Sequence, residues 1–162
     1  MENTKAREFK NEICEKYFNM IYKLALSQTK DTSMAEDVTG DVFLKFVESN
    51  KAFESEEHIK AWLIRVTLNC SKSVLSSSWF KKTVPLLETI TAEMPEEESE
   101  VYEAVLKLPQ KYRAVIHLFY YEEFSVAQIA NYLKLNESTV RTHLQRGRNL
   151  LKMSLEGEDE VV

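Results

Sequence analysis

The C-terminal quarter of the chain, Phe124 to Leu151, constrains the fold most because it carries two helix signals around a short turn. Ser125 and Gln128 have the spacing of a capping box, which predicts that a helix begins there. Asn136 is a favourable N-cap for a second helix. The inward stripe of that second helix has helical spacing and consists of Val140, Leu144, Gly147 and Leu151. The stretch therefore predicts a helix-turn-helix.

The outward face of the second helix is basic and polar, which is the composition of a helix that enters a DNA major groove. Arginine can pair bidentately with guanine, and glutamine with adenine. Arg146 suits a phosphate contact. A four-helix packing unit with a solvated charged face is the structural alternative. The candidate DNA-binding residues of this helix are Ser138, Thr139, Arg141, Thr142, Gln145, Arg146 and Arg148.

The composition indicates an all-helical protein, since 162 residues contain only three Gly and three Pro. The formal net charge of −5 is unevenly placed. Residues 83–100 carry six acidic and no basic side chains, whereas residues 101–152 carry eight basic and four acidic ones. Because the charge distribution decides the electrostatic footprint, an acidic total is compatible with DNA binding.

Two small helical domains are predicted, separated by an acidic linker that holds two of the three prolines. The first domain spans 1–82 and should contain three helices, over about Thr4–Thr29, Ser33–Glu48 and Ser55–Ser76. A capping box of Ser33 and Glu36 should open the second of these. The linker spans 83–100. The second domain spans 101–162; it opens with a helix near 100–107 and ends in an acidic tail.

The second helix of the first domain should present an acidic face with one or two apolar residues, which suits a basic protein partner. Its candidate partner-binding residues are Asp37, Asp41, Phe43 and Leu44. The apolar side chains of Phe43 and Leu44 are expected to be exposed. The helix dipole alone would explain acidic residues in the first turn. It does not explain Asp41.

The third helix places Trp62, Arg65, Asn69 and Lys72 at spacings of 3, 4 and 3, hence on one side. An aromatic ring, two cations and an amide together suit unstacked nucleic-acid bases. Trp62 equally fits a core position.

No catalytic or metal-binding pattern is found. The sequence has no glycine-rich phosphate loop, HExxH motif, CxxC pair or GxSxG motif. Its three histidines lack ligand spacing, and Cys14 and Cys70 should be reduced thiols. We therefore expect no enzymatic activity, no cofactor and no small-molecule substrate. No segment is apolar enough for a signal peptide or a membrane span.

Three segments in this order resemble the extracytoplasmic-function (ECF) sigma factors of bacterial RNA polymerase: AEDVTGDVFLKF, KAWLIRVTLNCSK and LPQKYRAVIHLFYYEEFSVAQIANYLKLNESTVRTHLQRGR. The resemblance covers about Phe9 to Leu151. It implies that the acidic helix binds the polymerase clamp through Asp37, Asp41, Phe43 and Leu44. The helix-turn-helix would read the minus-thirty-five element as duplex. The polymerase parts that the resemblance implies as partners are the clamp helices and the flap.

The same resemblance implies that the first domain melts and reads the minus-ten element through the loop before its third helix and through that helix, namely Phe53, His58, Trp62, Arg65, Asn69 and Lys72. It further implies core RNA polymerase, promoter DNA and an anti-sigma factor as partners. The chain would act in the bacterial cytoplasm and be held at the inner face of the membrane where the anti-sigma factor is membrane-anchored.

The chain departs from the family pattern at Gly40, where Gln is usual, and at Lys134, which replaces a Gly common in the turn, so that the turn should be wider or slightly strained. The segment after Asn69 lacks the usual Asp and arginine cluster. Two other classes remain open at this point. One is a stand-alone helix-turn-helix regulator whose first domain dimerises. The other is an interaction protein that sequesters a basic partner through the linker and tail.

Overall fold

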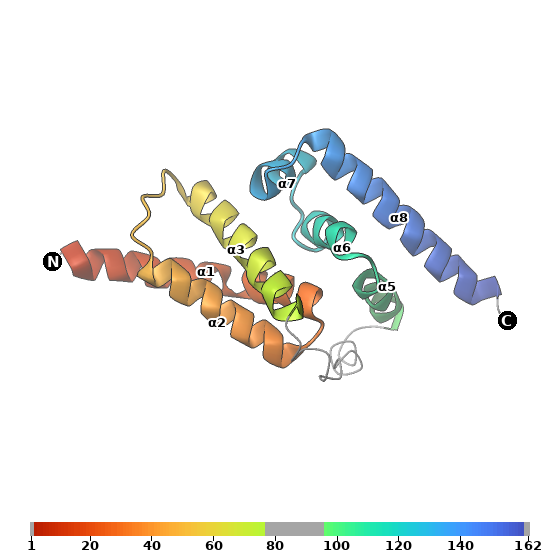
Figure 1. Cartoon of the computed structure of the whole chain (residues 1–162), viewed down its shortest axis with the longest axis horizontal. Coiled ribbons are helices and arrows are strands. Elements are labelled where there is room, and N and C mark those ends of the chain that lie inside the picture. Colours follow the sequence, from red (N-terminus) through yellow and green to blue (C-terminus); the bar gives the residue numbers. More distant parts are fainter. Residues whose placement is uncertain (1, 77–95, 161–162) are drawn as a thin grey trace.

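The computed structural model describes residues 2–76 and 96–160, and within these ranges every regular element is a helix (Figure 1). The prediction of an all-α fold is confirmed. In chain order the elements are α1 (Glu2–Thr29), α2 (Thr32–Glu48), α3 (Glu56–Ser76), α5 (Glu96–Leu106), α6 (Gln110–Ile116), η2 (His117–Tyr121), α7 (Val126–Leu133) and α8 (Glu137–Glu160).

The first three helices pack on one another around a single core. Apolar residues recur at helical spacing on each of them, so each buries one stripe and leaves the opposite face in water. On α2 the stripe includes Val38 and Val42, both fully buried, and on α3 it includes Leu63. This packing fixes which faces of α2 and α3 remain available to partners.

The start of α2 differs from the predicted capping box. Asp31 is the N-cap, and its carboxylate accepts a hydrogen bond of 2.9 Å from the backbone N–H of Met34. Ser33 therefore lies inside the first turn and Glu36 does not cap the helix. Both Asp and Ser are good N-caps, and the chain uses the one two residues earlier. The prediction that Ser33 caps this helix is wrong.

The remaining elements form the second group. α6 follows Pro109, as expected for a proline next to a helix start, and continues without a break into η2, a π-helical turn. His117 in η2 is 2% exposed and stacks its ring on that of Tyr121, so it is a packing residue. The bend after η2 lets α7 and α8 fold back across α6.

Only the last part of the predicted linker, 83–100, lies within the described residues. Residues 83–95 lie outside the described residues. Residues 96–100 belong to α5, which begins four residues before the predicted helix near 100–107. The acidic run therefore continues into a helix instead of ending before it.

The two groups of helices lie against each other through α3 and α7 and through α1 and α6 (Figure 1). Leu24 of α1 and Ile64 of α3 are fully buried in the same apolar cluster as Ile129 of α7 and Val115 of α6. The two groups of helices therefore share a buried interface, and the candidate sites lie on the surfaces that remain exposed.

Candidate nucleic-acid and partner interface

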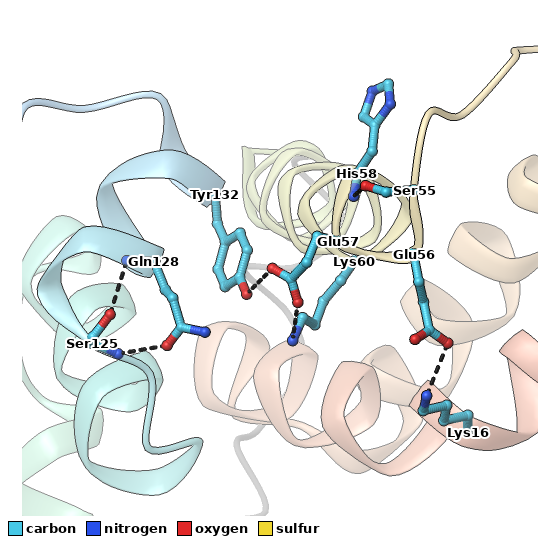
Figure 2. Close-up of polar contacts among 9 residues, drawn as sticks. All are labelled: Lys16, Ser55, Glu56, Glu57, His58, Lys60, Ser125, Gln128 and Tyr132. Carbon is cyan, nitrogen blue, oxygen red and sulfur yellow. Dashed lines mark hydrogen bonds and ion pairs between the residues drawn. The ribbon is translucent and has the colours of Figure 1, made fainter.

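The helix-turn-helix is built by α7 and α8. The predicted capping box is present at the start of α7: the Ser125 hydroxyl accepts from the Gln128 N–H at 3.1 Å, and the Gln128 side-chain carbonyl accepts from the Ser125 N–H at 2.9 Å (Figure 2). α7 ends at Lys134, whose φ of 56° and ψ of 46° are left-handed. The predicted strain at Lys134 is confirmed, because a side chain at this conformation costs about 1–2 kcal/mol.

The predicted inward stripe of α8 faces the core. Val140 is fully buried, Leu144 is 2% exposed, and Gly147 lies where a Cβ would be 3.0 Å from Ile116 Cγ1. The glycine therefore allows α8 to approach α6 closely. Because this stripe is fixed, the opposite face of α8 is fixed as well. Of the predicted DNA-binding residues, all are exposed except Thr139, which is half-buried.

Arg148 is exposed but does not extend freely from α8. Its Nε donates a hydrogen bond of 2.6 Å to the Tyr120 hydroxyl, and its guanidinium lies over the rings of Phe119 and Tyr120. Helical geometry places Arg148 on a flank of α8, whereas Gln145 and Thr142 are farther from the core stripe. Arg148 is thus held by its own domain, a contact that periodicity could not indicate.

The other flank of α8 is electropositive. Burial lowers the pKa of His143 below its ordinary value of 6.5, and the positive charges of Lys111 and Arg146 lower it further. The ring of His143 packs edge-on against Tyr112 at 5.5 Å between centroids. Cations from α6 and α8 therefore act on one side of the helix-turn-helix, and such a field attracts phosphates.

The acidic face of α2 is partly as predicted. Asp37 and Asp41 are exposed, and Leu44 is 55% exposed. Phe43, in contrast, is only 9% exposed and stacks on Phe18 of α1 at 6.2 Å between centroids. The expectation that Phe43 is exposed is wrong, because α1 covers it. Phe18 is the exposed aromatic of this pair, at 49%.

The loop before α3 is tied down by an aromatic cluster. The ring of Phe53 lies 5.7 Å from that of Trp62, 5.3 Å from that of His58 and 5.8 Å from that of Phe46, each between centroids. His58 also accepts the Glu54 N–H at Nδ1 with 3.1 Å. Trp62 is thus a packing residue of this cluster. Its ring is only half-buried, so it also keeps an exposed surface on which a base could stack.

The four α3 residues predicted on one side do not share one environment. Trp62 faces the loop cluster, whereas Arg65 turns towards α7 and donates from Nη1 to the Tyr132 carbonyl at 3.2 Å. Asn69 and Lys72 are exposed. Asn69 lines a groove of about 280 Å³ between α2 and α3, together with Asp41 and Cys70. The structure therefore places Asn69 and Asp41 along one groove, whereas Arg65 is engaged by α7.

Glu57, Lys60 and Tyr132 form a polar contact between α3 and α7 that the sequence analysis did not identify (Figure 2). The apolar residues Ile129, Ala130 and Leu133 of α7 indicate that one face of this helix is buried, but not which element covers it. Arg113 is a second example: it is 5% exposed, donates to the carbonyls of Leu106 and Leu108, and has a pKa lowered to about 10 by burial.

Within residues 2–76 and 96–160, no group of three or more His, Cys, Asp and Glu side chains is placed to hold a metal ion. Among the helices of those same ranges, none combines the length and apolar character that crossing a membrane requires. Cys14 and Cys70 are free thiols and half-buried.

Comparisons with known proteins agree across both groups of helices. The family profile described as Sigma-70 region 2 matches residues 13–80, and the one described as Sigma-70, region 4 matches residues 98–151. Two curated relatives come from Bacillus subtilis (strain 168). The ECF RNA polymerase sigma factor SigW is 26% identical over 89% of this chain and 87% of its own, and RNA polymerase sigma factor SigV is 26% identical over 85% and 86%.

A solved structure, that of CnrH in complex with the cytosolic domain of CnrY, has a TM-score of 0.64 and 20% identity. It covers 93% of this chain and 97% of the other. At this level of identity the likeness concerns the fold, and it extends over both helical groups.

Proposed function

We propose roles for the surfaces of this chain on one premise: it belongs to the ECF family of bacterial RNA polymerase sigma factors. Such a factor directs core RNA polymerase to promoters and starts transcription there. The match of the first group of helices to Sigma-70 region 2 does not favour a stand-alone regulator with a dimerising domain. We propose that the chain is a non-enzymatic initiation factor that acts in the bacterial cytoplasm, where the polymerase is found.

The domain limits belong to this proposal. Residues 1–82 form the domain that binds the polymerase clamp and the minus-ten element, 83–100 the acidic linker, and 101–162 the domain that binds the minus-thirty-five element and the flap. The family profiles, which match 13–80 and 98–151, support this division. The helical start at Glu96 suggests that the second folded unit begins within the acidic run.

The minus-thirty-five element is read by α8. The observation that carries this role is the exposed basic and polar face of the second helix of a helix-turn-helix. Arg141 and Gln145 are exposed there and reach base edges in the major groove, and Arg146 contacts phosphate. Ser138, Thr139 and Thr142 border the same face. Arg148 contributes from the position that Tyr120 holds.

The minus-ten element is read as an unpaired strand by the first domain. Exposed Asn69 offers an amide for a base edge, and Lys72 offers a charge for phosphate. The half-buried rings of Phe53, His58 and Trp62 offer a stacking surface that is held in place by Phe46. Arg65 takes part once its contact with α7 is released.

The polymerase clamp is bound by the exposed part of the α2 face, with Asp37, Asp41 and Leu44 in contact and Phe43 supporting them through Phe18. An anti-sigma factor is a further proposed partner. The CnrH structure is of a complex with the cytosolic domain of CnrY, which supports a partner of that kind for this chain. Such a partner, if membrane-anchored, would hold the chain at the inner face of the membrane.

Reconstituted transcription tests the proposal. The purified chain is added to core polymerase, and run-off transcripts are measured on a library of promoters. The variant Asp41→Lys should weaken binding of core polymerase about tenfold or more, because it reverses a charge at the proposed contact. Glu12→Lys, the same charge change on the exposed side of α1, is the matched control. Equal polymerase binding by the two variants would remove α2 from the interface.

A further inference from the structure

Arg148 of α8 is held in place by two aromatic residues of η2. Its Nε donates a hydrogen bond of 2.6 Å to the hydroxyl of Tyr120. Its guanidinium carbon lies 5.6 Å from the centre of the Tyr120 ring and 5.7 Å from that of Phe119, within the range of a cation–π contact. Tyr120 is 50% exposed, so this arrangement lies at the surface of the protein, where a ligand can reach it.

The backbone on both sides of this contact is fixed by packing. Gly147, the residue before Arg148, lies so close to α6 that a Cβ there would be 3.0 Å from Cγ1 of Ile116. Ile116 is 1% exposed, and the π-helical turn of η2 that carries Tyr120 follows it directly. Such turns are rare and are frequent at functional sites. The close packing of α6 on α8 therefore brings Tyr120 to Arg148.

The hydrogen bond to Tyr120 decides which end of the guanidinium can meet a ligand. A guanidinium has five N–H donors in a fixed planar fork, one of them on Nε and two on each Nη. Tyr120 accepts from the donor on Nε of Arg148. The two Nη atoms form the opposite end of the fork, and two oxygens of a phosphate can accept from both of them at once. Tyr120 therefore orients Arg148 for end-on pairing with an anion.

The place of Arg148 on α8 favours a phosphate over a base edge. In a helix-turn-helix the N-terminal residues of the second helix contact base edges. α8 begins at Glu137, which is about 16 Å from Arg148 at 1.5 Å per residue. Arg148 also lies on a flank of α8, and Lys111 and Arg146 act on the opposite flank, at His143. Positive charge on both flanks suits a helix in the major groove, which has a phosphate backbone on each side.

We propose that Tyr120 is a positioning residue for promoter binding: it holds Arg148 end-on towards a phosphate at the edge of the minus-thirty-five element. This proposal rests on the proposed function and adds to it the kind of contact that Arg148 makes and the residue that prepares it. An arginine held in advance loses less rotamer freedom when it binds a ligand. Tyr120 therefore raises the affinity for DNA through Arg148.

A packing role for Arg148 is the alternative that the experiment has to separate. Arg148 lines an apolar cavity of about 380 Å³ together with Ile116, Tyr120 and Leu151. If its side chain acted only as a cover for this cavity, substitutions of Arg148 and Tyr120 would change the stability of the domain and leave phosphate recognition unchanged.

Neighbouring tyrosines provide a matched test. Tyr120→Phe removes the hydroxyl and keeps the ring under the guanidinium, and Arg148→Met removes the charge and keeps an unbranched stem over the cavity. Tyr121→Phe is the control: it removes the same group from the next residue, whose ring packs on His117 and Tyr102.

Each full-length variant, and the double variant Tyr120→Phe/Arg148→Met, is assembled with core polymerase. Binding to a promoter chosen by run-off transcription is measured over a series of salt concentrations. The promoter is used intact and with single phosphates of the minus-thirty-five region replaced by neutral methylphosphonates. Thermal unfolding of the free variants reports on packing.

We expect at least one methylphosphonate to weaken binding by the wild type. Arg148→Met should remove that effect and lower the slope of log affinity against log salt by about one. Tyr120→Phe should weaken binding about two- to tenfold, the range for one hydrogen bond, and have no further effect in the Arg148→Met background. Tyr121→Phe should match the wild type.

The proposal is overturned if Tyr120→Phe binds the promoter as tightly as the wild type, or if it weakens binding equally with and without Arg148→Met. Insensitivity of the wild type to every methylphosphonate overturns it as well, whatever the variants do. These results leave the proposed function intact as long as the wild type initiates transcription. A wild-type chain that initiates at no promoter refutes the proposed function itself.

Discussion

Gly147 and Gly40 should respond in opposite ways to the same substitution, because one glycine is required by packing and the other is not. Gly40 lies in α2, is exposed, and a Cβ there would meet no atom within 4 Å. Gly147 lies in α8, where a Cβ would be 3.0 Å from Cγ1 and 3.2 Å from Cδ1 of Ile116. Ordinary contacts between carbon atoms are about 3.5–4.0 Å.

The magnitudes follow from helix propensity and crowding. Alanine is favoured over glycine in a helix interior by about 0.8–1.0 kcal/mol. Gly40→Ala should therefore raise the free energy of unfolding by about that amount and the Tm by roughly 2–4 °C. Gly147→Ala gains the same propensity but overpacks a side chain that is 1% exposed, at a typical cost of about 1–3 kcal/mol. The net change is a destabilisation of up to about 2 kcal/mol.

Denaturant unfolding followed by circular dichroism measures both values, and Ile116 supplies the mechanistic control. Ile116→Val removes one of the two crowded carbons, so Gly147→Ala should cost less in that background than in the wild type. Two outcomes contradict the packing argument. One is equal stabilisation by both alanine variants, and the other is strict additivity of Gly147→Ala with Ile116→Val.

Three further predictions concern the turn of the helix-turn-helix, the contact between α3 and α7, and the opening of promoter DNA. Lys134→Gly should stabilise the chain by about 0.5–1 kcal/mol, because glycine adopts the left-handed conformation without the side-chain penalty; thermal unfolding checks this. Hydrogen bonds from Lys60 and Tyr132 lower the pKa of Glu57 below its ordinary value of 4.5, so the contact of Glu57 with these two side chains should be complete above pH 4.5 and weaken as pH falls through the lowered pKa. Small-angle scattering of the wild type and of Glu57→Gln at pH 7 and near pH 4 tests this. The variant should lack that part of the pH response. Asn69→Ala should impair opening of the minus-ten region, measured by permanganate reactivity of thymines, and a pre-melted template should restore much of the activity; normal opening and base preference would exclude Asn69 from the site.

Local signals in the sequence predicted the elements well, since each depends on residues close along the chain. The Ser125–Gln128 capping box and the inward stripe of α8 both follow from spacing and residue type, whereas strain at Lys134 was expected only from the family resemblance. The error at α2 has the same origin: Asp31 and Ser33 are both good N-caps, and local pattern alone cannot rank them.

Contacts between distant segments were not predictable in this way. Phe43 is covered by Phe18 of α1, and Arg148 is held by Tyr120 of η2, because the packing of separate helices decides both positions. Helical spacing correctly places Trp62 and Arg65 near one another on α3, but only the fold shows that one faces the loop and the other faces α7. The packing of the two groups of helices on each other was not predictable either. The sequence shows that separate helices have apolar faces, but not that these faces contact each other.

The groove between α2 and α3 connects the two proposed roles of the first domain. Asp41, assigned to the polymerase, and Asn69, assigned to the unpaired strand, line opposite walls of it, and Lys45 reaches across to within 3.5 Å of the Cys70 sulfur. A partner bound on α2 therefore borders the site where a base would be read. A lysine introduced at position 41 would add a positive charge beside Asn69, so Asp41→Lys can increase strand affinity while it weakens polymerase binding. Asp41→Asn removes the carboxylate of the proposed polymerase contact without adding that charge. A loss of polymerase binding common to both variants would assign the effect to the acidic face itself.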